Sequence, residues 1–213
     1  MNLNQIKRPY DMIVSLGWNC QTAFQLKRKK LRSFTGPIDW MYSYSVSHLC
    51  RLLKQKFNGF MEIENMRIEG IQGTNSCYTV SDLNTRCVSV HDFLVTENSD
   101  TSLLTYPQFK EKMNRRIEKL YNSLAISDSA LFVRIQANRD EALELKNAIS
   151  EVYHGDFSIL IINYTKEEKV IEIDWAIDRV CAVEISNSVN AWTGCNSAWD
   201  TILEGVTLSE GSD

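Results

Sequence analysis

The sequence has no long hydrophobic run. Its apolar stretches, such as residues 12–16 and 159–162, are only as long as β-strands. A membrane-spanning helix needs about 20 predominantly apolar residues, and the apolar core of a secretory signal peptide is also longer than these stretches. We therefore expect a soluble, cytoplasmic protein that does not contact a membrane.

An excess of positive charge is also missing. The chain has 23 lysines and arginines against 27 aspartates and glutamates, which gives a net charge of -4. The one notable basic run, residues 27–30, falls at the end of a predicted helix, where cations complement the helix dipole. Proteins that bind nucleic acid normally present a basic patch. We therefore expect no nucleic-acid partner.

Paired cysteine motifs are absent as well. None of the six cysteines has the C-x-x-C spacing that is typical of zinc sites and dithiol redox motifs. We expect no metal, no cofactor and thiols that stay reduced in the cytoplasm. Most of these cysteines should be small hydrophobic residues of the core. They are Cys20, Cys50, Cys77, Cys87, Cys181 and Cys195.

What the sequence does contain is an alternation of helix and strand patterns. A strong helix pattern covers residues 107–124, and strand patterns at 130–136 and 157–164 flank a helix pattern at 139–153. This β-α-β order, with apolar strands, indicates parallel pairing under helices. We predict one α/β domain over residues 1–213, with three αβα layers around a mainly parallel sheet.

Cys20 occupies a predicted strand-to-helix turn. Residues 10–16 predict a buried strand, Gly17 ends it, and Asn19 caps a helix that we expect over residues 20–31. In an open α/β sheet such a turn lies where ligands usually bind. A helix N-terminus also stabilises a thiolate, so the pKa of Cys20 should lie below its ordinary value of about 8.5. The alternative interpretation is a buried structural cysteine.

A cysteine nucleophile usually needs a base, and the chain offers three histidines. His48 falls inside a predicted helix and His154 at a helix end, where each has a structural explanation. His91 lies near the end of a strand expected over residues 86–95, and it would face Cys20 if that strand lay beside the first one. We therefore choose His91 as the candidate base.

The group that would orient the base is left open by the sequence. Asp92 adjoins His91, but neighbours on a strand point to opposite faces. Asp39 in the loop after Gly36 and Asn163 at a strand end could each reach His91. A turn cap for Asp39 and a strand-end hydrogen bond for Asn163 are the structural alternatives.

The predicted turn also offers groups that could bind a substrate. The helix N–H groups and the Asn19 amide could hold an oxyanion, and Gly17 leaves room for a ligand. Arg134 interrupts an apolar strand, so it needs either a carboxylate partner or an anionic ligand. The substrate-binding candidates are therefore Gly17, Asn19 and Arg134.

Four short segments resemble a bacterial family of unknown function whose members are described as papain-like cysteine peptidases. The resemblance is best over residues 10–60 and extends more weakly to Asn163. It implies a nucleophile at Cys20, a partner at His91 and, from the chain order of papain-like enzymes, a third residue at Asn163. It also implies an alternative fold, the papain-like α+β arrangement. The segments are Ser15-Leu16-Gly17-Trp18-Asn19-Cys20-Gln21, Ala23-Phe24-Gln25-Leu26, Pro37-Ile38-Asp39-Trp40 and His91-Asp92-Phe93.

Two functions therefore follow from the sequence. The first is a cysteine-dependent hydrolase, peptidase-like or an acyl transferase, that acts through the Cys20–His91 pair on a small-molecule or peptide substrate. The second is a non-catalytic domain that binds an anionic small molecule, such as a phosphate or a sugar nucleotide, at the strand-to-helix turn. The oligomeric state and the identity of the substrate stay open.

Overall fold

The computed structural model describes residues 1–72, 76–187 and 192–209, and their strands form three sheets. The five-stranded sheet has the order β2 (Met12–Ser15), β7 (Ser129–Ile135), β8 (Asp156–Thr165), β10 (Val180–Ser186) and β9 (Ile171–Ile173). The four-stranded sheet has the order β3 (Met41–Ser43), β6 (Cys87–Leu94), β5 (Cys77–Asp82) and β4 (Met66–Ile71). The small third sheet joins β1 (Pro9–Tyr10) to β11 (Thr207–Leu208).

The five-stranded sheet is parallel except for one edge. The strands β2, β7, β8 and β10 pair in parallel, and β9 runs antiparallel to β10. Both faces are buried, because Val14 and Phe132 belong to one hydrophobic cluster whereas Ile13 and Leu131 belong to another. Burial on both faces explains why these strands appear in the sequence as continuous apolar runs.

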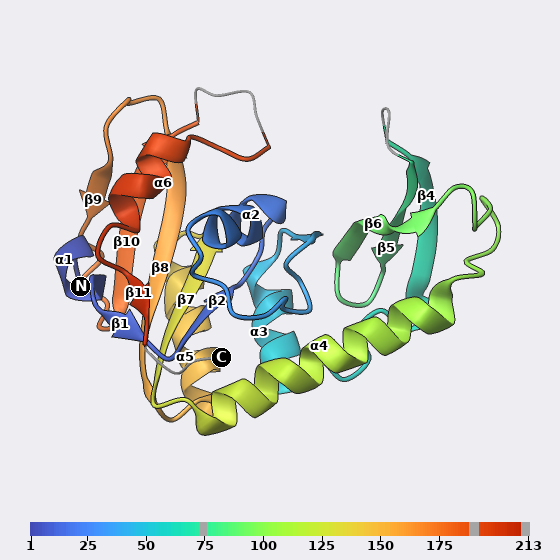
Figure 1. The fold of residues 1–213 in the computed structure, drawn as a ribbon, viewed down its shortest axis with the longest axis horizontal. Helices are drawn as coiled ribbons and strands as arrows, with labels where there is room; N and C mark the ends of the chain where they lie inside the picture. Colours follow the sequence, from blue (N-terminus) through green and yellow to red (C-terminus); the bar gives the residue numbers. More distant parts are fainter. Residues whose placement is uncertain (73–75, 188–191, 210–213) are drawn as a thin grey trace.

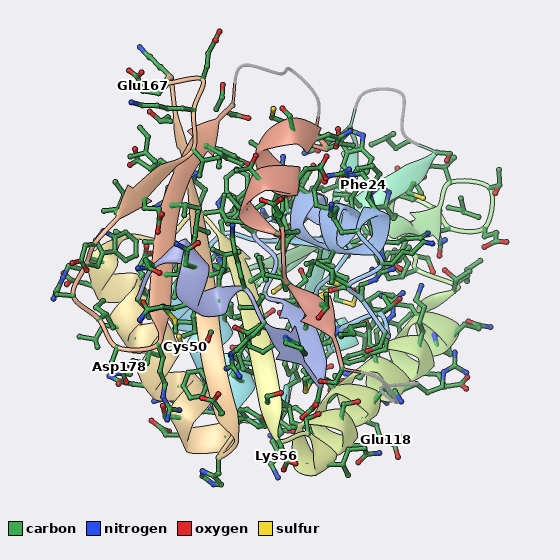
Figure 2. All side chains as sticks on the ribbon, turned by 60° about the vertical axis from the view of Figure 1, so that its left-hand side comes forward. Phe24, Cys50, Lys56, Glu118, Glu167 and Asp178 are labelled. Carbon is green, nitrogen blue, oxygen red and sulfur yellow. The ribbon has the colours of Figure 1, made fainter. Side chains whose placement is uncertain are left out.

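Helices cover both faces of this sheet. One cluster includes residues of α1 (Leu3–Ile6), α2 (Cys20–Arg28) and α6 (Asn196–Ile202). The opposite cluster includes residues of α3 (Val46–Lys54), α4 (Tyr106–Ile126) and α5 (Arg139–Val152). Figure 2 illustrates the division between interior and surface, with Cys50 inside the molecule and Glu118 of α4 pointing outward.

The antiparallel sheet lies to one side of the parallel sheet, and α4 runs beneath both (Figure 1). The α/β class is thus confirmed, but the expectation of one mainly parallel sheet was incomplete. The antiparallel sheet was not expected. It includes β3, which has only three residues, and β4, whose side chains alternate between half-buried and exposed. The papain-like α+β alternative also fits only in part, because the larger sheet is mostly parallel.

The residue ranges predicted for the helices and strands are close to the observed ones. The helix expected over residues 107–124 is α4, and the helix expected over 139–153 is α5. Among residues 1–72, 76–187 and 192–209, none of the helices combines the length and the apolar character that crossing a bilayer requires.

Candidate active site

A sharp turn joins β2 to α2 and carries the candidate nucleophile. Gly17 has a φ of +71° and Trp18 a φ of +92°. Residues other than glycine rarely adopt this backbone conformation. The Gly17 N–H donates to Ser15 Oγ (3.3 Å), and the Trp18 N–H donates to Ser43 Oγ (3.0 Å). These bonds hold a strained backbone that directs Cys20 into the first turn of α2.

Replacing Gly17 with alanine is expected to destabilise the fold by about 3 kcal/mol, which equilibrium unfolding in urea would measure. A Cβ atom at Gly17 would lie 2.6 Å from Ser43 Oγ, and the positive φ adds a further penalty of about 1–2 kcal/mol. Gly59 is the matched control, because its φ is +74° but its nearest neighbour, Asn84 Nδ2, would be 3.6 Å away. Equal losses of stability in the Gly17→Ala and Gly59→Ala variants would contradict a steric role for Ser43.

Cys20 and His91 are in contact. The distance from Cys20 Sγ to His91 Nε2 is 3.6 Å, which is within hydrogen-bonding range for sulfur. Cys20 is the first residue of α2, and the Asn19 side chain accepts from the Gln21 N–H (2.9 Å) as the predicted cap. The structure therefore brings together the two residues that the sequence selected as nucleophile and base.

A bulge in β6 places the histidine. Residues Tyr78 and Phe93 pair across β5 and β6, and Val80 pairs with Ser89, so three residues of β6 lie opposite one residue of β5. Irregularities of this kind redirect side chains and are common beside active sites. His91 is the middle residue of the three, and its side chain is exposed while reaching the thiol.

The acidity of Cys20 differs from the prediction. Burial, which is the largest cause, and the nearby charges of Asp39 and Asp92 raise the pKa of the Cys20 thiol to about 11, whereas its own backbone N–H acts in the opposite direction. The side chain is only 6% exposed, so the loss of hydration outweighs the helix N-terminus. At neutral pH Cys20 is a protonated thiol that needs a base to become a nucleophile.

The three candidates for orienting His91 are engaged elsewhere. Asp92 accepts from Ser89 Oγ (2.5 Å) and pairs with Lys112 (2.6 Å). Asp39 is buried, pairs with Arg32 (2.9 Å) and accepts from the Gly36 N–H (2.9 Å). Burial raises the pKa of Asp39 to about 6, although Arg32 acts in the opposite direction.

Asn163 also has a structural partner. Its side-chain oxygen accepts from the Ala137 N–H (3.1 Å), and its side-chain nitrogen donates to the Ala137 carbonyl (2.9 Å). These two hydrogen bonds fix the chain just beyond β7. Within the part of the chain that the structure describes, neither Asp39 nor Asn163 hydrogen bonds to His91.

Arg134 has neither of the partners that the sequence suggested. It is fully buried, and its two terminal nitrogens donate to the Leu16 carbonyl (2.8 Å), to Ser43 Oγ and carbonyl (3.0 and 2.6 Å) and to the Tyr44 carbonyl (3.2 Å). Burial lowers the pKa of Arg134 to about 10. The guanidinium thus ties the nucleophile turn to β3, and the expected carboxylate or ligand is replaced by backbone carbonyls.

A cavity of about 220 Å³ opens onto the Cys20–His91 pair. Its described lining consists of Asn19, Cys20, Tyr42, Val90, His91 and Trp192. Tyr42, Val90 and Trp192 were not selected from the sequence, because an apolar residue beside a site has the same pattern as a core residue. Among the described residues, no group of three or more His, Cys, Asp or Glu side chains could hold a metal ion.

The fold and the site together define an α/β protein with a thiol and an imidazole paired at the end of a parallel strand. The chain belongs to the family described as "Putative papain-like cysteine peptidase (DUF1796)", whose model matches residues 11–167. It is also similar to "Uncharacterized protein R408" of Acanthamoeba polyphaga mimivirus, with 23% identity over 218 residues that cover 90% of this chain and 96% of that protein. No solved structure matches the chain. This relative is viral, so the expected bacterial origin stays a prediction.

Proposed function

We propose that this protein is a cysteine-dependent hydrolase or acyl transferase in which Cys20 is the nucleophile and His91 is the general base. The observation that carries the proposal is the 3.6 Å contact between Cys20 Sγ and His91 Nε2 beside a cavity. The family description supports the same chemistry. Because Asp39 and Asn163 have other partners, we assign a dyad without a third residue.

The first half of the reaction acylates the enzyme. His91 Nε2 takes the proton of the Cys20 thiol while Sγ forms a bond to the carbonyl carbon of the substrate. The carbonyl electron pair moves to the oxygen, and the resulting oxyanion accepts from the Cys20 N–H and from Asn19 Nδ2 at the start of α2. When the carbonyl re-forms, the bond to the leaving group breaks and His91 returns the proton to that group.

The second half releases the acyl group. His91 takes a proton from an incoming water molecule, whose oxygen attacks the thioester carbon. The carbon–sulfur bond then breaks, a carboxylic acid leaves and Cys20 recovers its proton from His91. An amine or an alcohol in place of water gives acyl transfer by the same steps.

The alternative function, the binding of an anionic small molecule, has less support. None of the described residues that line the cavity is a lysine or an arginine. Arg134, the cation proposed for this role, donates to protein carbonyls instead. We also propose a cytoplasmic location, which the six free thiols support because a reducing compartment preserves them.

The proposal is tested by trapping the acyl-enzyme. We expect p-nitrophenyl acetate to acetylate Cys20, seen by peptide mass spectrometry after an acid quench, and to release p-nitrophenol in a burst. The Cys20→Ala variant should show neither. Cys195 is the competing thiol, because it is partly exposed and hydrogen bonding to Ser197 lowers its pKa. A Cys195→Ser variant should therefore keep the burst, and a burst that depends on Cys195 would refute the proposal.

A further inference from the structure

Trp192, from the C-terminal part of the chain, lines the cavity. Trp192 is 59% exposed, although it is the largest kind of apolar side chain, and it lines the same cavity as Cys20. It lies outside residues 11–167, which the family model matches. This part of the wall is therefore supplied by a segment beyond the matched region.

Buried side chains of α2 fix this segment in place. Gln21 Nε2 donates to the Trp192 carbonyl (3.2 Å), and Gln25 Nε2 donates to the Thr193 carbonyl (2.7 Å). Gln21 and Gln25 are 2% and 0% exposed, and Tyr164 donates to Gln21 Oε1 (2.8 Å). A buried amide that is hydrogen bonded at both its nitrogen and its oxygen holds its partners in place. The backbone of Trp192 is thus anchored from one side of α2.

The contacts between the segment and α2 are close. A Cβ atom at Gly194 would lie 2.4 Å from Gln21 Nε2 and would displace that amide, and the φ of +74° at Gly194 is one that other residues rarely adopt. The rings of Trp192 and Phe24 meet edge to face, with centroids 5.1 Å apart, and Phe24 is labelled on α2 in Figure 2. Trp192 is therefore held at both its backbone and its ring while most of its surface stays exposed.

The other apolar walls of the cavity come from the antiparallel sheet. Tyr42 lies on β3 and Val90 on β6. Tyr42 is itself stacked against Tyr44, with ring centroids 5.4 Å apart. Rigid aromatic walls favour flat, apolar groups, which they contact over a large area at little cost in entropy.

The size and charge of the cavity further limit the kind of group that can bind there. Cavities that bind whole drug-sized molecules measure about 300–1,000 Å³, whereas this one measures about 220 Å³. It therefore accepts one substituent of a substrate. Because none of its described lining residues is a lysine, arginine, aspartate or glutamate, a charged substituent would lose its hydration without gaining a partner.

We infer that Trp192 is a specificity-determining residue, and that Trp192, Tyr42 and Val90 form a seat for an uncharged, flat apolar group next to the substrate carbonyl. The inference rests on the proposed role of Cys20 as nucleophile. It assigns the substrate class as acyl compounds with an aromatic or flat apolar substituent beside the reacting carbonyl.

The test compares two alkylating probes that differ by one phenyl ring, iodoacetamide and N-phenyl iodoacetamide. Rates at Cys20 are followed by peptide mass spectrometry and divided by the rates of N-acetylcysteine with the same probes. We expect the phenyl probe to be favoured about tenfold at Cys20, as one seated aromatic ring should produce. The Trp192→Ala variant should lose this preference, so that the ratio of its two normalised rates falls to about one.

Two further variants separate a specific effect from a general one. Trp192→Phe keeps an aromatic ring and should keep most of the preference. Leu104→Ala removes another exposed apolar side chain, 72% exposed and absent from the described cavity lining, and should change nothing. An unchanged preference in Trp192→Ala would overturn the inference while leaving Cys20 as the nucleophile. Cys20 could be alkylated with the expected preference and yet never be acylated by the ester. In that case the proposed function is refuted, whereas the apolar binding site formed by Trp192, Tyr42 and Val90 is supported.

Discussion

Replacing His91 with alanine is expected to slow the acylation of Cys20 by about 10²–10⁴-fold, the usual contribution of a positioned general base. The reason is the raised pKa of the Cys20 thiol, about 11, which leaves it protonated at neutral pH. The imidazole at 3.6 Å is the base that the structure provides for this proton. The p-nitrophenol burst measures the effect.

The pH dependence of the His91→Ala variant gives a second readout. The thiolate fraction of Cys20 grows as the pH rises toward about 11, so the residual rate of the variant should climb steadily from pH 7 to that value. The exposed His154 supplies the control, since His154→Ala should behave as the unaltered protein does. A rate in the His91→Ala variant that equals that of the unaltered protein at pH 7 would exclude His91 as the base.

Replacing Arg134 with methionine is expected to destabilise the fold by about 3–5 kcal/mol. The change leaves the carbonyls of Leu16, Ser43 and Tyr44 without the charged donor that they share in a fully buried position. Removing a buried cation relieves part of this cost, because the protein no longer has to desolvate it. Urea unfolding measures the loss.

A matched arginine shows whether the loss depends on burial. Arg115 lies on α4, where its side chain is 68% exposed and pairs with Glu111, so Arg115→Met should change the stability by less than about 0.5 kcal/mol. If Arg134→Met were as stable as Arg115→Met, the four hydrogen bonds of Arg134 would not hold the turn. A ligand-binding role, which the sequence had left open, would then regain support.

The sequence pointed to both members of the thiol–imidazole contact that the structure contains. The apolar run before Gly17 and the cap at Asn19 locate Cys20 at the start of a helix, and α2 does begin at Cys20. His91 was selected because the other two histidines had structural explanations. These signals are local, and local backbone preferences carry over into the folded chain.

The route by which His91 reaches Cys20 was not predictable. From the sequence, His91 would face Cys20 if its strand lay beside the first strand of the parallel sheet, but β6 pairs with β3 and β5 in the antiparallel sheet. The contact instead depends on the short strand β3 and on the bulge opposite Thr79. Both arise from pairing between distant segments, which the periodicity of one segment does not encode.

The pKa of Cys20 was mispredicted for a similar reason. A helix start does lower a thiol pKa, but at Cys20 the effect of burial is larger and raises it. Trp192 was missed because it joins the site from a segment that is far from Cys20 along the chain. Such effects appear only when the whole chain is folded.

The placement of the thiol and the imidazole on different sheets makes their alignment a collective property of the molecule. Cys20 follows a strand of the parallel sheet, whereas His91 belongs to the antiparallel sheet, and the long helix α4 runs along both (Figure 1). The hydrogen bonds within each sheet do not fix how the two sheets are placed against each other, which depends on the bonds that join the nucleophile turn and β7 to β3, among them those of Ser43 and Arg134. If these contacts loosen, the distance between Cys20 and His91 changes and proton transfer slows, so reactivity at Cys20 reports on packing beyond the cavity.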